Sequence, residues 1–494
     1  MAEKTKNVAM PGNPRYQPPQ LVPYFGYDNL YAGLARVEIA TLQTLGQIGV
    51  IPAADMALLT PELIERLSAI PTTDVDRLER EVTKHDVRAW VRIAQTILPP
   101  LIGRWLHVPL TSYDALDTGR ILQYRAAYQG ALKPALTNVI TIFIAMVRQY
   151  AGTLQIGRTH GQHALPISVG FWLATILDRL VRNAMQLDLA ACQLVGKISG
   201  AVGAYNAQVG LGISERCGQK TFEERVLEKV GLKSGPISTQ ILQPEPLANF
   251  LYACALLSAS FGQFGRDCRN LMRSEIAEVH EEYEAGQTGS STMAHKRNPL
   301  NFEQLEGMWH STKYELAKVL DMLLSEHQRD LVGSSVMRNF PIILVNLQCQ
   351  MNVLLRPNKA GTPFLSRISV DEQACQRNFN ASAKVVLAEP LYIALLMAGY
   401  EGDAHALVNE VLIPRAQKNG KSLLEEFGYL AGKVSSRNAK GQPVKDEDQS
   451  ALEAYRRMPE EIAHLLDSPR SYTGSATEQA LKIADQAEAF VAAA

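Results

Sequence analysis

Residues 122–152 read LQYRAAYQGALKPALTNVITIFIAMVRQYAG, with apolar side chains recurring at the i, i+3, i+4 and i+7 spacing of one helix face. The segments 166–198, 244–286 and 299–328 repeat this pattern over many turns. Helices of this length cannot bury their apolar faces alone, so we expect them to pack side by side. Sustained strand-type alternation is scarce. The predicted fold class is all-α, with a long central helical bundle.

Breaks in the helical pattern indicate where domains end. The stretch RPNKAGTP at 356–363 combines Pro, Asn and Gly and predicts the end of the central bundle. The sequence SVDE at 369–372 predicts a capping box that starts a new helix. Upstream, HVPLTSYDALDTG at 107–119 interrupts a smaller helical region. We therefore expect an N-terminal helical domain over 1–113, a central long-helix bundle over 114–358 and a C-terminal helical domain over 359–494.

The composition argues against several classes of partner. The 494 residues include 49 Lys and Arg against 50 Asp and Glu, so no basic excess favours nucleic acid. The six cysteines lack CxxC spacing, which is typical of reduced thiols in a cytosolic protein. The longest apolar run, VITIFIAMV at 139–147, is too short to span a bilayer, and residues 1–19 lack the apolar core of a signal peptide. We expect a cytoplasmic protein that binds neither nucleic acid nor membrane.

Polar and charged side chains are concentrated in GQTGSSTMAHKRNPLNFE, at 286–303. The Asn298-Pro299 pair predicts a helix start, so the preceding residues should lie over a helix N-terminus, which favours an anion. Lys296 adds a positive charge, and near such a charge the cost of deprotonating a serine falls. The stretch could hold an anionic substrate and present a serine as a base. An ordinary solvated loop is the alternative.

Within this stretch, GSSTMAHKRNP at 289–299 resembles the signature loop of the fumarase/aspartase superfamily, which usually reads GSSxMPxKxNP. Other segments resemble those of adenylosuccinate lyases, in the same order along the chain: PRYQPP, EVTKHDVRAW, HVPLTSYDALDTG, GRTHGQHALPIS, ISTQ, RDLVGSSVMR and LLDSPRSYTGSATEQA. The resemblance implies a three-domain fumarase/aspartase-like fold. Pro109, Ala294 and Ser475 depart from the family pattern, and their effect stays open.

The same resemblance implies a chemistry. It implies anti elimination of fumarate from adenylosuccinate, giving AMP, and from the succinylated aminoimidazole carboxamide ribotide of purine synthesis. Ser291 would be the base and His160 the acid, with Glu303 paired to His160. Lys296 would stabilise the carbanion. The resemblance further implies a homotetramer with active sites shared between chains, and a reaction without metal or organic cofactor.

Substrate-binding residues are expected in the same motifs, at Arg15, Tyr16, His85, Asp86, Thr111, Ser112, Thr159, Gln240, Ser290, Asn298, Arg329, Ser334 and Arg338. The VGSS sequence at 332–335 should break a helix, so Ser334 or Ser335 is expected to cap a new one, with Arg338 one turn along. Two arginines converging on a helix N-terminus suit a phosphate. This feature favours a nucleotide over fumarate, aspartate or argininosuccinate.

Other interpretations remain open. His160 and His163 form an HxxH pattern that could ligate a metal, but no third ligand cluster with recognisable spacing accompanies it. A histidine also suits general acid work near neutral pH. A buried structural role is the alternative for His85. For the whole chain, the alternatives are another lyase of the superfamily, a carboxymuconate cycloisomerase, or a non-catalytic relative.

Overall fold

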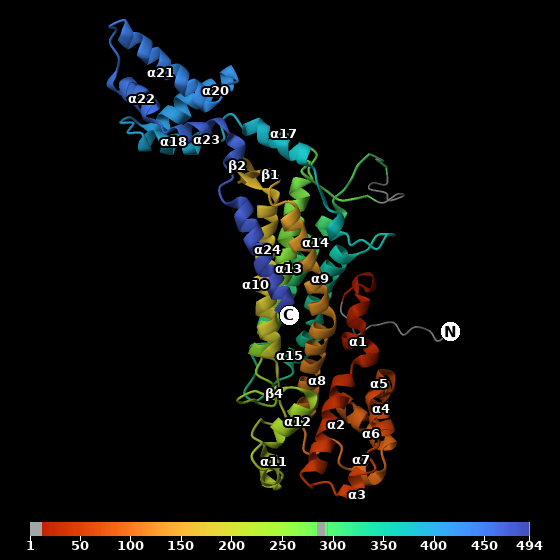
Figure 1. Ribbon diagram of the computed structural model, residues 1–494. Coiled ribbons are helices and arrows are strands. Elements are labelled where there is room, and N and C mark those ends of the chain that lie inside the picture. The colour runs from red at the N-terminus through yellow and green to blue at the C-terminus, as the bar shows by residue number, and fades with distance from the viewer. Residues whose placement is uncertain (1–11, 284–291, 294, 494) are drawn as a thin grey trace. The chain divides into compact units, whose positions relative to one another are not determined.

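The computed structural model describes residues 12–283, 292–293 and 295–493, and helices make up most of them (Figure 1). The strands described pair in three two-stranded sheets. The predicted all-α fold class is therefore confirmed. The chain divides into two compact units: a first unit of Met1–Val139, Arg179–Arg266 and Leu300–Pro357, and a second unit of Ile140–Asp178, Asp267–Pro299 and Asn358–Ala494. The expected boundaries at 113 and 358 stay a prediction.

The first unit holds the following elements in whole or in part: α1 (Val22–Phe25), α2 (Ala32–Gln47), α3 (Ala53–Met56), α4 (Pro61–Ser68), α5 (Thr72–Leu78), α6 (Asp86–Ile97), α7 (Pro100–Gly103), α8 (Ser112–Ala127), α9 (Lys133–Gln149), α10 (Val169–Cys192), β3 (Val195–Gly196), α11 (Asn206–Gly210), α12 (Phe222–Val230), β4 (Lys233–Ser234), α13 (Glu245–Leu271), α14 (Leu300–Asp321), α15 (Val332–Met337) and α16 (Pro341–Leu355). A π-helical turn, Tyr128–Leu132, joins α8 to α9. β3 and β4 pair in parallel.

Long helices form the core of the first unit, and α13 packs against both α8 and α14. Phe250 of α13 meets Tyr124 of α8 edge to face, with ring centroids 6.2 Å apart. Gln350 of α16 is fully buried, and its Nε2 donates to the carbonyl oxygens of Ser258 in α13 and Leu305 in α14, at 3.1 and 2.8 Å. One amide thus ties three helices together and satisfies carbonyls that water cannot reach.

Helix α2 lies closely against α8 where two glycines face each other. A Cβ atom built on Gly33 would lie 2.3 Å from the carbonyl oxygen of Gly119, so a side chain cannot fit there. The backbones of α2 and α8 are therefore in direct contact at these glycines, which fixes the position of α8 against α2. It matters for function because the first turn of α8 carries Thr111 and Ser112.

The second unit contains a β-hairpin and helices from the C-terminal part of the chain. Its further elements are β1 (Leu154–Thr159), β2 (Gln162–Ser168), β5 (Val279–His280), β6 (Ser369–Val370), α17 (Glu372–Ser382), α18 (Ala388–Met397), α19 (Ala404–Ala406), α20 (Ile413–Asn419), α21 (Leu423–Ala439), α22 (Asp446–Arg457), α23 (Glu460–Asp467) and α24 (Ala476–Ala493). β1 pairs antiparallel with β2, and β5 pairs antiparallel with β6. A cluster of buried apolar side chains, including Phe379, Leu391, Leu412 and Phe427, forms its core.

Several helix boundaries differ from those expected. The helical stretch predicted to reach 286 ends at Leu271, and residues 166–168 belong to β2 rather than to a helix. The expected capping box at 369–372 is wrong, because Ser369 lies in β6 and the Asp371 side chain accepts the cap bond from the Ala374 amide at 2.8 Å. The carboxylate is the stronger acceptor at a helix N-terminus.

Two helical stretches, Ser112–Gln149 and Glu245–Leu271, are long and apolar enough to cross a membrane by length and composition. The apolar run at 139–147 is only part of the first stretch. Their most apolar windows are 56% and 67% buried inside the protein, as core helices are. Their length is therefore explained by packing within the bundle.

Candidate active site

His85 and Ser112 come together in the first unit, at the start of two helices. His85 is the N-cap of α6, where its Nδ1 accepts from the Arg88 amide at 3.5 Å. Its Nε2 lies 3.3 Å from the Ser112 hydroxyl, at the first residue of α8. The Asp86 carboxylate lies 3.3 Å from Nδ1. The imidazole is half exposed, so its ring faces solvent beside a hydroxyl and a carboxylate.

A second group of polar contacts links Ser334, Arg329 and Gln240 through Tyr113. The Tyr113 hydroxyl lies 2.6 Å from the Ser334 hydroxyl, and the Arg329 guanidinium lies 3.5 Å from the centre of the Tyr113 ring. Arg329 Nη1 also donates to the Gln240 side-chain oxygen at 2.8 Å. Because Ser112 contacts His85 and is adjacent to Tyr113, five of the expected binding residues meet near one helix start. His85, Ser112, Gln240, Arg329 and Ser334 are called the first-unit site below.

The start of α15 differs from the prediction. The helix begins at Val332, and Ser334 and Ser335 lie inside it, so neither serine is its cap. The Asp330 carboxylate takes that role by accepting from the Val332 amide at 2.7 Å, and hydrogen bonds from the Glu326 and Val332 amides lower the pKa of Asp330. A carboxylate therefore already occupies the helix N-terminus. A bound phosphate would meet side chains here and not the α15 amides.

Arg338 lies at the C-terminal end of α15, and its side chain is exposed. Burial, and then the charges of Asp86 and Asp76, raise the pKa of Glu79, whereas Arg338 and His85 lower it. Arg338 and His85 thus act on the same carboxylate. The two arginines expected to share an anion differ in setting, because Arg329 is stacked on a ring and Arg338 is free to reach outward.

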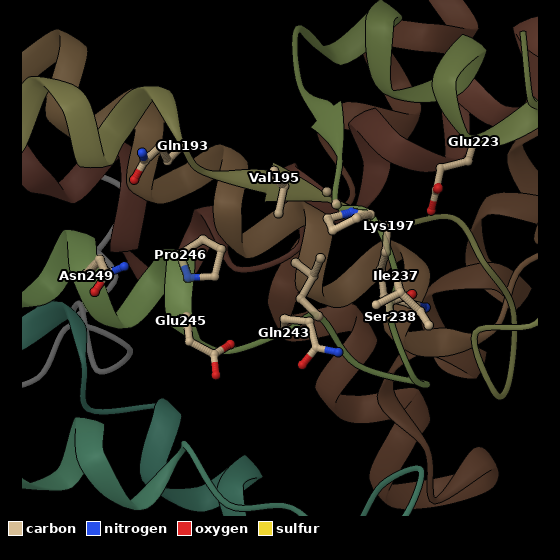
Figure 2. Close-up of a pocket in the computed structure, with 14 residues that line it drawn as sticks. Gln193, Val195, Lys197, Glu223, Ile237, Ser238, Gln243, Glu245, Pro246 and Asn249 are labelled. Atoms are coloured by element: carbon tan, nitrogen blue, oxygen red, sulfur yellow. The ribbon is translucent and has the colours of Figure 1, made fainter.

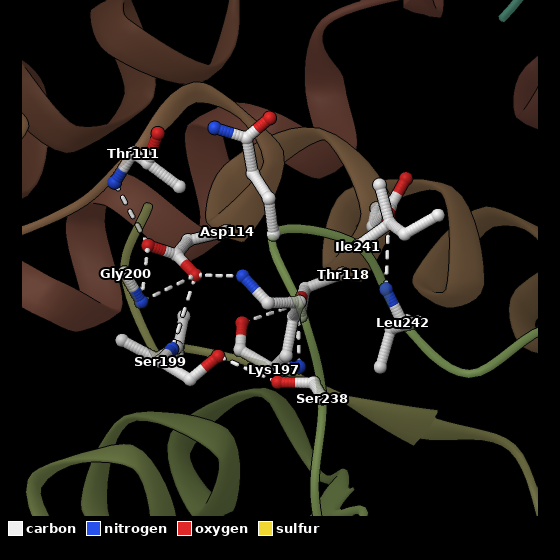
Figure 3. A network of polar contacts seen from close by, with 12 residues as sticks. Thr111, Asp114, Thr118, Lys197, Ser199, Gly200, Ser238, Ile241 and Leu242 are labelled. Carbon is white, nitrogen blue, oxygen red and sulfur yellow. Dashed lines mark hydrogen bonds and ion pairs between the residues drawn. The ribbon is translucent and has the colours of Figure 1, made fainter. Parts of the chain in front are cut away.

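A buried carboxylate holds the first turn of α8. Asp114 and Thr111 form a capping box, with the Thr111 amide donating to Asp114 at 2.8 Å. Asp114 also pairs with the Lys197 ammonium and accepts from the Ser199 and Gly200 amides at 3.1 and 3.2 Å (Figure 3). Both charged side chains are 1% exposed, so each satisfies the other's charge out of water. The network fixes the backbone that carries Thr111 and Ser112.

A cavity of about 280 Å³ lies beside this network and shares Lys197 with it (Figure 2). Its lining comes from residues 193–249, including Glu223, Ser238 and Gln243. The Ser238 hydroxyl lies 2.6 Å from that of Ser199, which connects the cavity wall to the Asp114 network (Figure 3). Gln240, of the first-unit site, follows two residues after Ser238 along the same segment.

In the second unit, Thr159 ends β1, and His160 follows in the turn of the β1–β2 hairpin. His160 is exposed and has a φ of 54°, a left-handed conformation that non-glycine residues rarely adopt. Glu278 holds β1 at two points: its fully buried carboxylate accepts from Arg158 Nη2 at 2.6 Å and from Gln155 at 2.9 Å. The hairpin is thus anchored from below while His160 projects from its end.

His163, the other histidine of the HxxH pattern, lies 2.7 Å through Nδ1 from the Ser382 hydroxyl. Burial, and then the charge of Arg158, lower the pKa of His163. Among the described residues, no group of three or more His, Cys, Asp or Glu side chains is arranged to hold a metal ion. The second histidine therefore has a hydrogen-bonding role at the hairpin.

Ser290 and Ser291 of the signature loop lie outside the described residues, so their roles stay predictions. Lys296 is exposed, and the carbonyl of Asn298 accepts from the Tyr283 hydroxyl at 2.7 Å. As expected, a helix starts here, although α14 begins at Leu300, after the Asn-Pro pair. Glu303 lies exposed on α14 in the first unit, whereas His160 belongs to the second unit. Their pairing stays a prediction.

Arg15 and Tyr16 form a short 3-10 turn, Pro14–Tyr16, and the Tyr16 carbonyl accepts from the Cys349 thiol of α16 at 3.1 Å. Within the part of the chain that the structure describes, no hydrogen bond joins either residue to His85 or Ser334. These two residues are therefore placed along α16 and are not brought into the first-unit site.

Sequence reasoning missed Tyr113, Asp114, Lys197 and Glu278. Asp114 lies in the segment HVPLTSYDALDTG that resembles adenylosuccinate lyases, so a signal for that residue was present. Lys197 and Glu278 had no local signal, because each acts through a partner distant in the sequence. Tyr113 lies in the same segment, but the resemblance assigned no role to that position.

Solved structures with the same fold support this architecture. A 3-carboxy-cis,cis-muconate lactonizing enzyme from Pseudomonas putida matches with a TM-score of 0.74 and 23% identity, covering 96% of this chain and 98% of that chain. A fumarate lyase from Mesorhizobium sp. BNC1 matches with a TM-score of 0.74 and 20% identity, covering 95% and 98%. At these identities the likeness establishes the fold alone.

Sequence relatives establish the family. A family model described as Lyase matches residues 67–311. The adenylosuccinate lyase of Bacillus subtilis is 31% identical over 386 residues, covering 78% of this chain and 84% of that protein. Those of Synechocystis sp. and Pyrococcus horikoshii are 33% and 31% identical, covering 81% and 88% of their lengths and 75% and 83% of this chain. This chain is a lyase and belongs to the adenylosuccinate lyase family of the fumarase/aspartase superfamily.

Proposed function

We propose that the chain eliminates fumarate from adenylosuccinate in the anti sense, giving AMP, and also cleaves the succinylated aminoimidazole carboxamide ribotide. The observation that carries the proposal is the first-unit site, where Tyr113, the residue after Ser112, contacts both the Arg329 guanidinium and the Ser334 hydroxyl. A guanidinium with hydroxyl donors suits a phosphate. Fumarate and carboxymuconate carry no phosphate, so this site favours a nucleotide over the substrates of the rival enzymes.

In the proposed reaction, Ser291 removes a proton from the β-carbon of the succinyl group. Lys296 and Asn298 stabilise the aci-carboxylate that forms, and Ser290 contacts the substrate. The C–N bond then breaks, with His160 protonating the departing nitrogen and Glu303 holding the imidazolium. The products are fumarate and the amine nucleotide, so protons and electrons balance without an added oxidant or cofactor.

We also propose a cytoplasmic homotetramer in which chains share active sites. Apolar side chains of the first unit support association: Leu320, Leu324, Leu331 and Val332 are 60%, 82%, 70% and 75% exposed. Mixing His160→Ala chains with Ser291→Ala chains should restore part of the activity if the two residues meet across subunits. Fully active monomers, or no recovery after proven subunit exchange, would contradict shared sites.

The test of the proposed function is an assay of the purified protein with adenylosuccinate, following fumarate and AMP together. We expect equal amounts of both products. Ser291→Ala should lose about 10²–10⁴-fold in kcat, the usual contribution of a general base, while Ser290→Ala should lose less. Turnover of carboxymuconate with no cleavage of adenylosuccinate would establish the rival activity. No turnover of either would favour a non-catalytic relative.

A further inference from the structure

Tyr113 connects more of the first-unit site than any residue that the sequence motifs identified there. Its side chain is buried, with 7% of the residue exposed, yet both ends of it are used. The ring carries the Arg329 guanidinium at 3.5 Å, and the Arg120 guanidinium lies 5.9 Å from the same ring centre. The hydroxyl meets Ser334 at 2.6 Å.

The contact with Arg329 fixes the direction of a charged group. A guanidinium 3.5 Å from a ring centre is in stacking contact, which is attractive because the ring face is electron-rich. Arg329 also donates through Nη1 to the Gln240 oxygen at 2.8 Å and through Nε to the Asp330 carbonyl at 3.3 Å. A long side chain held in this way loses less conformational freedom when it binds an anion.

Tyr113 itself stands on a rigid part of the chain. It lies between Ser112 and Asp114 in the first turn of α8, and Asp114 is held by Lys197, Ser199 and Gly200 (Figure 3). This network holds the backbone from which the Tyr113 side chain extends. The position of Arg329 therefore depends on the start of α8, although the two segments are far apart in the sequence.

We infer that Tyr113 is a positioning residue that orients Arg329 and Ser334 toward an anionic group of the substrate. The inference rests on the proposed function, in which Arg329 binds the substrate phosphate. Tyr113 is too buried to take part in the reaction, and its hydroxyl is engaged by Ser334. It acts through its neighbours, so its loss should weaken substrate binding more than it slows the chemical step.

The test compares Tyr113→Leu and Tyr113→Phe with Tyr124→Leu, a buried tyrosine on the same helix that contacts Phe25 and Phe250. Tyr113→Leu should raise the KM for adenylosuccinate roughly three- to thirtyfold, the range of a desolvated cation–ring contact, with a smaller change in kcat. Tyr113→Phe keeps the stacking and should raise KM less. Tyr124→Leu should lower thermal stability and leave the KM of the folded enzyme unchanged.

A double-mutant cycle with Arg329→Ala separates positioning from general stability. If Tyr113 acts through Arg329, adding Tyr113→Leu to Arg329→Ala should raise KM little further. Suppose that Arg329→Ala raises KM. If Tyr113→Leu alone then leaves KM unchanged, or raises KM as much in Arg329→Ala as in the wild type, the inference is overturned and the proposed function stands. If Arg329→Ala itself leaves KM unchanged, the phosphate role and the inference both fail.

Discussion

In the first unit, Ser112, Arg329 and Ser334 are joined through one tyrosine ring and one histidine, whereas in the second unit His160 stands exposed at the end of a hairpin. Both regions are supported by a buried carboxylate, Asp114 in one and Glu278 in the other. In the first unit Asp114 holds the start of α8, and from that helix start Ser112 contacts His85 and Tyr113 contacts Arg329 and Ser334. In the second unit Glu278 holds the side chains of Gln155 and Arg158, and His160 lies beyond them in the turn.

The difference matches what the two regions are proposed to do. Binding an anion benefits from donors already fixed in direction, because less conformational freedom is then lost on binding. The proposed general acid, His160, must instead contact the departing nitrogen of the substrate and the carboxylate of Glu303. The comparison therefore predicts that substitutions in the first unit act on affinity, while substitutions at the hairpin tip act on turnover.

The largest expected effect is on turnover at the hairpin tip. His160→Gln should lower kcat by about 10²–10⁴-fold, since it removes the proposed proton donor. The free energy of unfolding should stay close to that of the wild type, because the side chain is exposed. Steady-state kinetics and chemical denaturation measure both quantities.

The matched control is His163→Gln in the same hairpin. His163 bonds to the Ser382 hydroxyl and has no proposed contact with the substrate. It should retain most of the wild-type kcat. Equal losses in the two variants would mean that the hairpin, and not His160 itself, is what the reaction requires.

The next largest effect is on stability, at the buried ion pair of strand β1. Glu278→Gln leaves Arg158 without its charged partner, and breaking a buried pair costs about 3–5 kcal/mol. Chemical denaturation measures the change. The matched control is Glu488→Gln, which breaks an exposed Glu–Arg pair with Arg148 and should change stability far less. Similar losses in both variants would contradict the anchoring role of Glu278.

A third prediction concerns affinity in the first unit. Arg338→Ala should weaken binding of the nucleotide about ten- to a hundredfold, the range for charge-assisted contacts, and barely change binding of the dephosphorylated nucleoside. Calorimetry with the two ligands measures the difference. The exposed Arg77→Ala serves as a control for loss of positive charge elsewhere. Equal losses for nucleotide and nucleoside would remove Arg338 from the phosphate site.

Much of this could be predicted from the sequence, for a physical reason. Apolar periodicity over many turns determines helix type and bundle packing, so the fold class followed from residues such as those at 122–152. The family resemblance named His85 and Ser112 as separate binding residues, and their contact became visible only in the structure. The start of α15 could not be predicted in this way, because aspartate and serine are both good caps and the sequence offers Asp330, Ser334 and Ser335 within six residues.

The buried ion pairs could not be predicted from the sequence. Lys197 and Asp114, like Arg158 and Glu278, are charged residues of a kind that usually lies on the surface. Only the folded chain brings the partners together, and no local spacing announces them. One pair supports the start of α8 and the other supports the β1–β2 hairpin, and the motifs alone indicated neither.

The smallest expected effect is a pH dependence of the free energy of unfolding, at a contact between α2 and the segment that leads into α8. His107 precedes that helix, and its Nδ1 lies 2.6 Å from the buried Glu38 carboxylate. Burial lowers the pKa of His107, but the hydrogen bond to Glu38 and its charge together outweigh burial, so the pKa is raised above 6.5. The protonated histidine therefore stabilises the folded state fully below 6.5, and this stabilisation is lost as the pH rises through the higher folded pKa.

The free energy of unfolding, measured from about pH 6 to about pH 9, should thus fall more in the wild type than in His107→Gln. Glu38→Gln separates the causes: without the carboxylate, burial and the charge of Arg88 lower the pKa of His107 and outweigh the smaller opposing effect of Asp114, so the contribution of His107 should change sign and stability should rise with pH over the same interval. If wild type and His107→Gln show the same pH dependence of the free energy of unfolding, the His107–Glu38 pair does not stabilise the segment that leads into α8. The rigidity of the first-unit site would then rest on Asp114 and its partners.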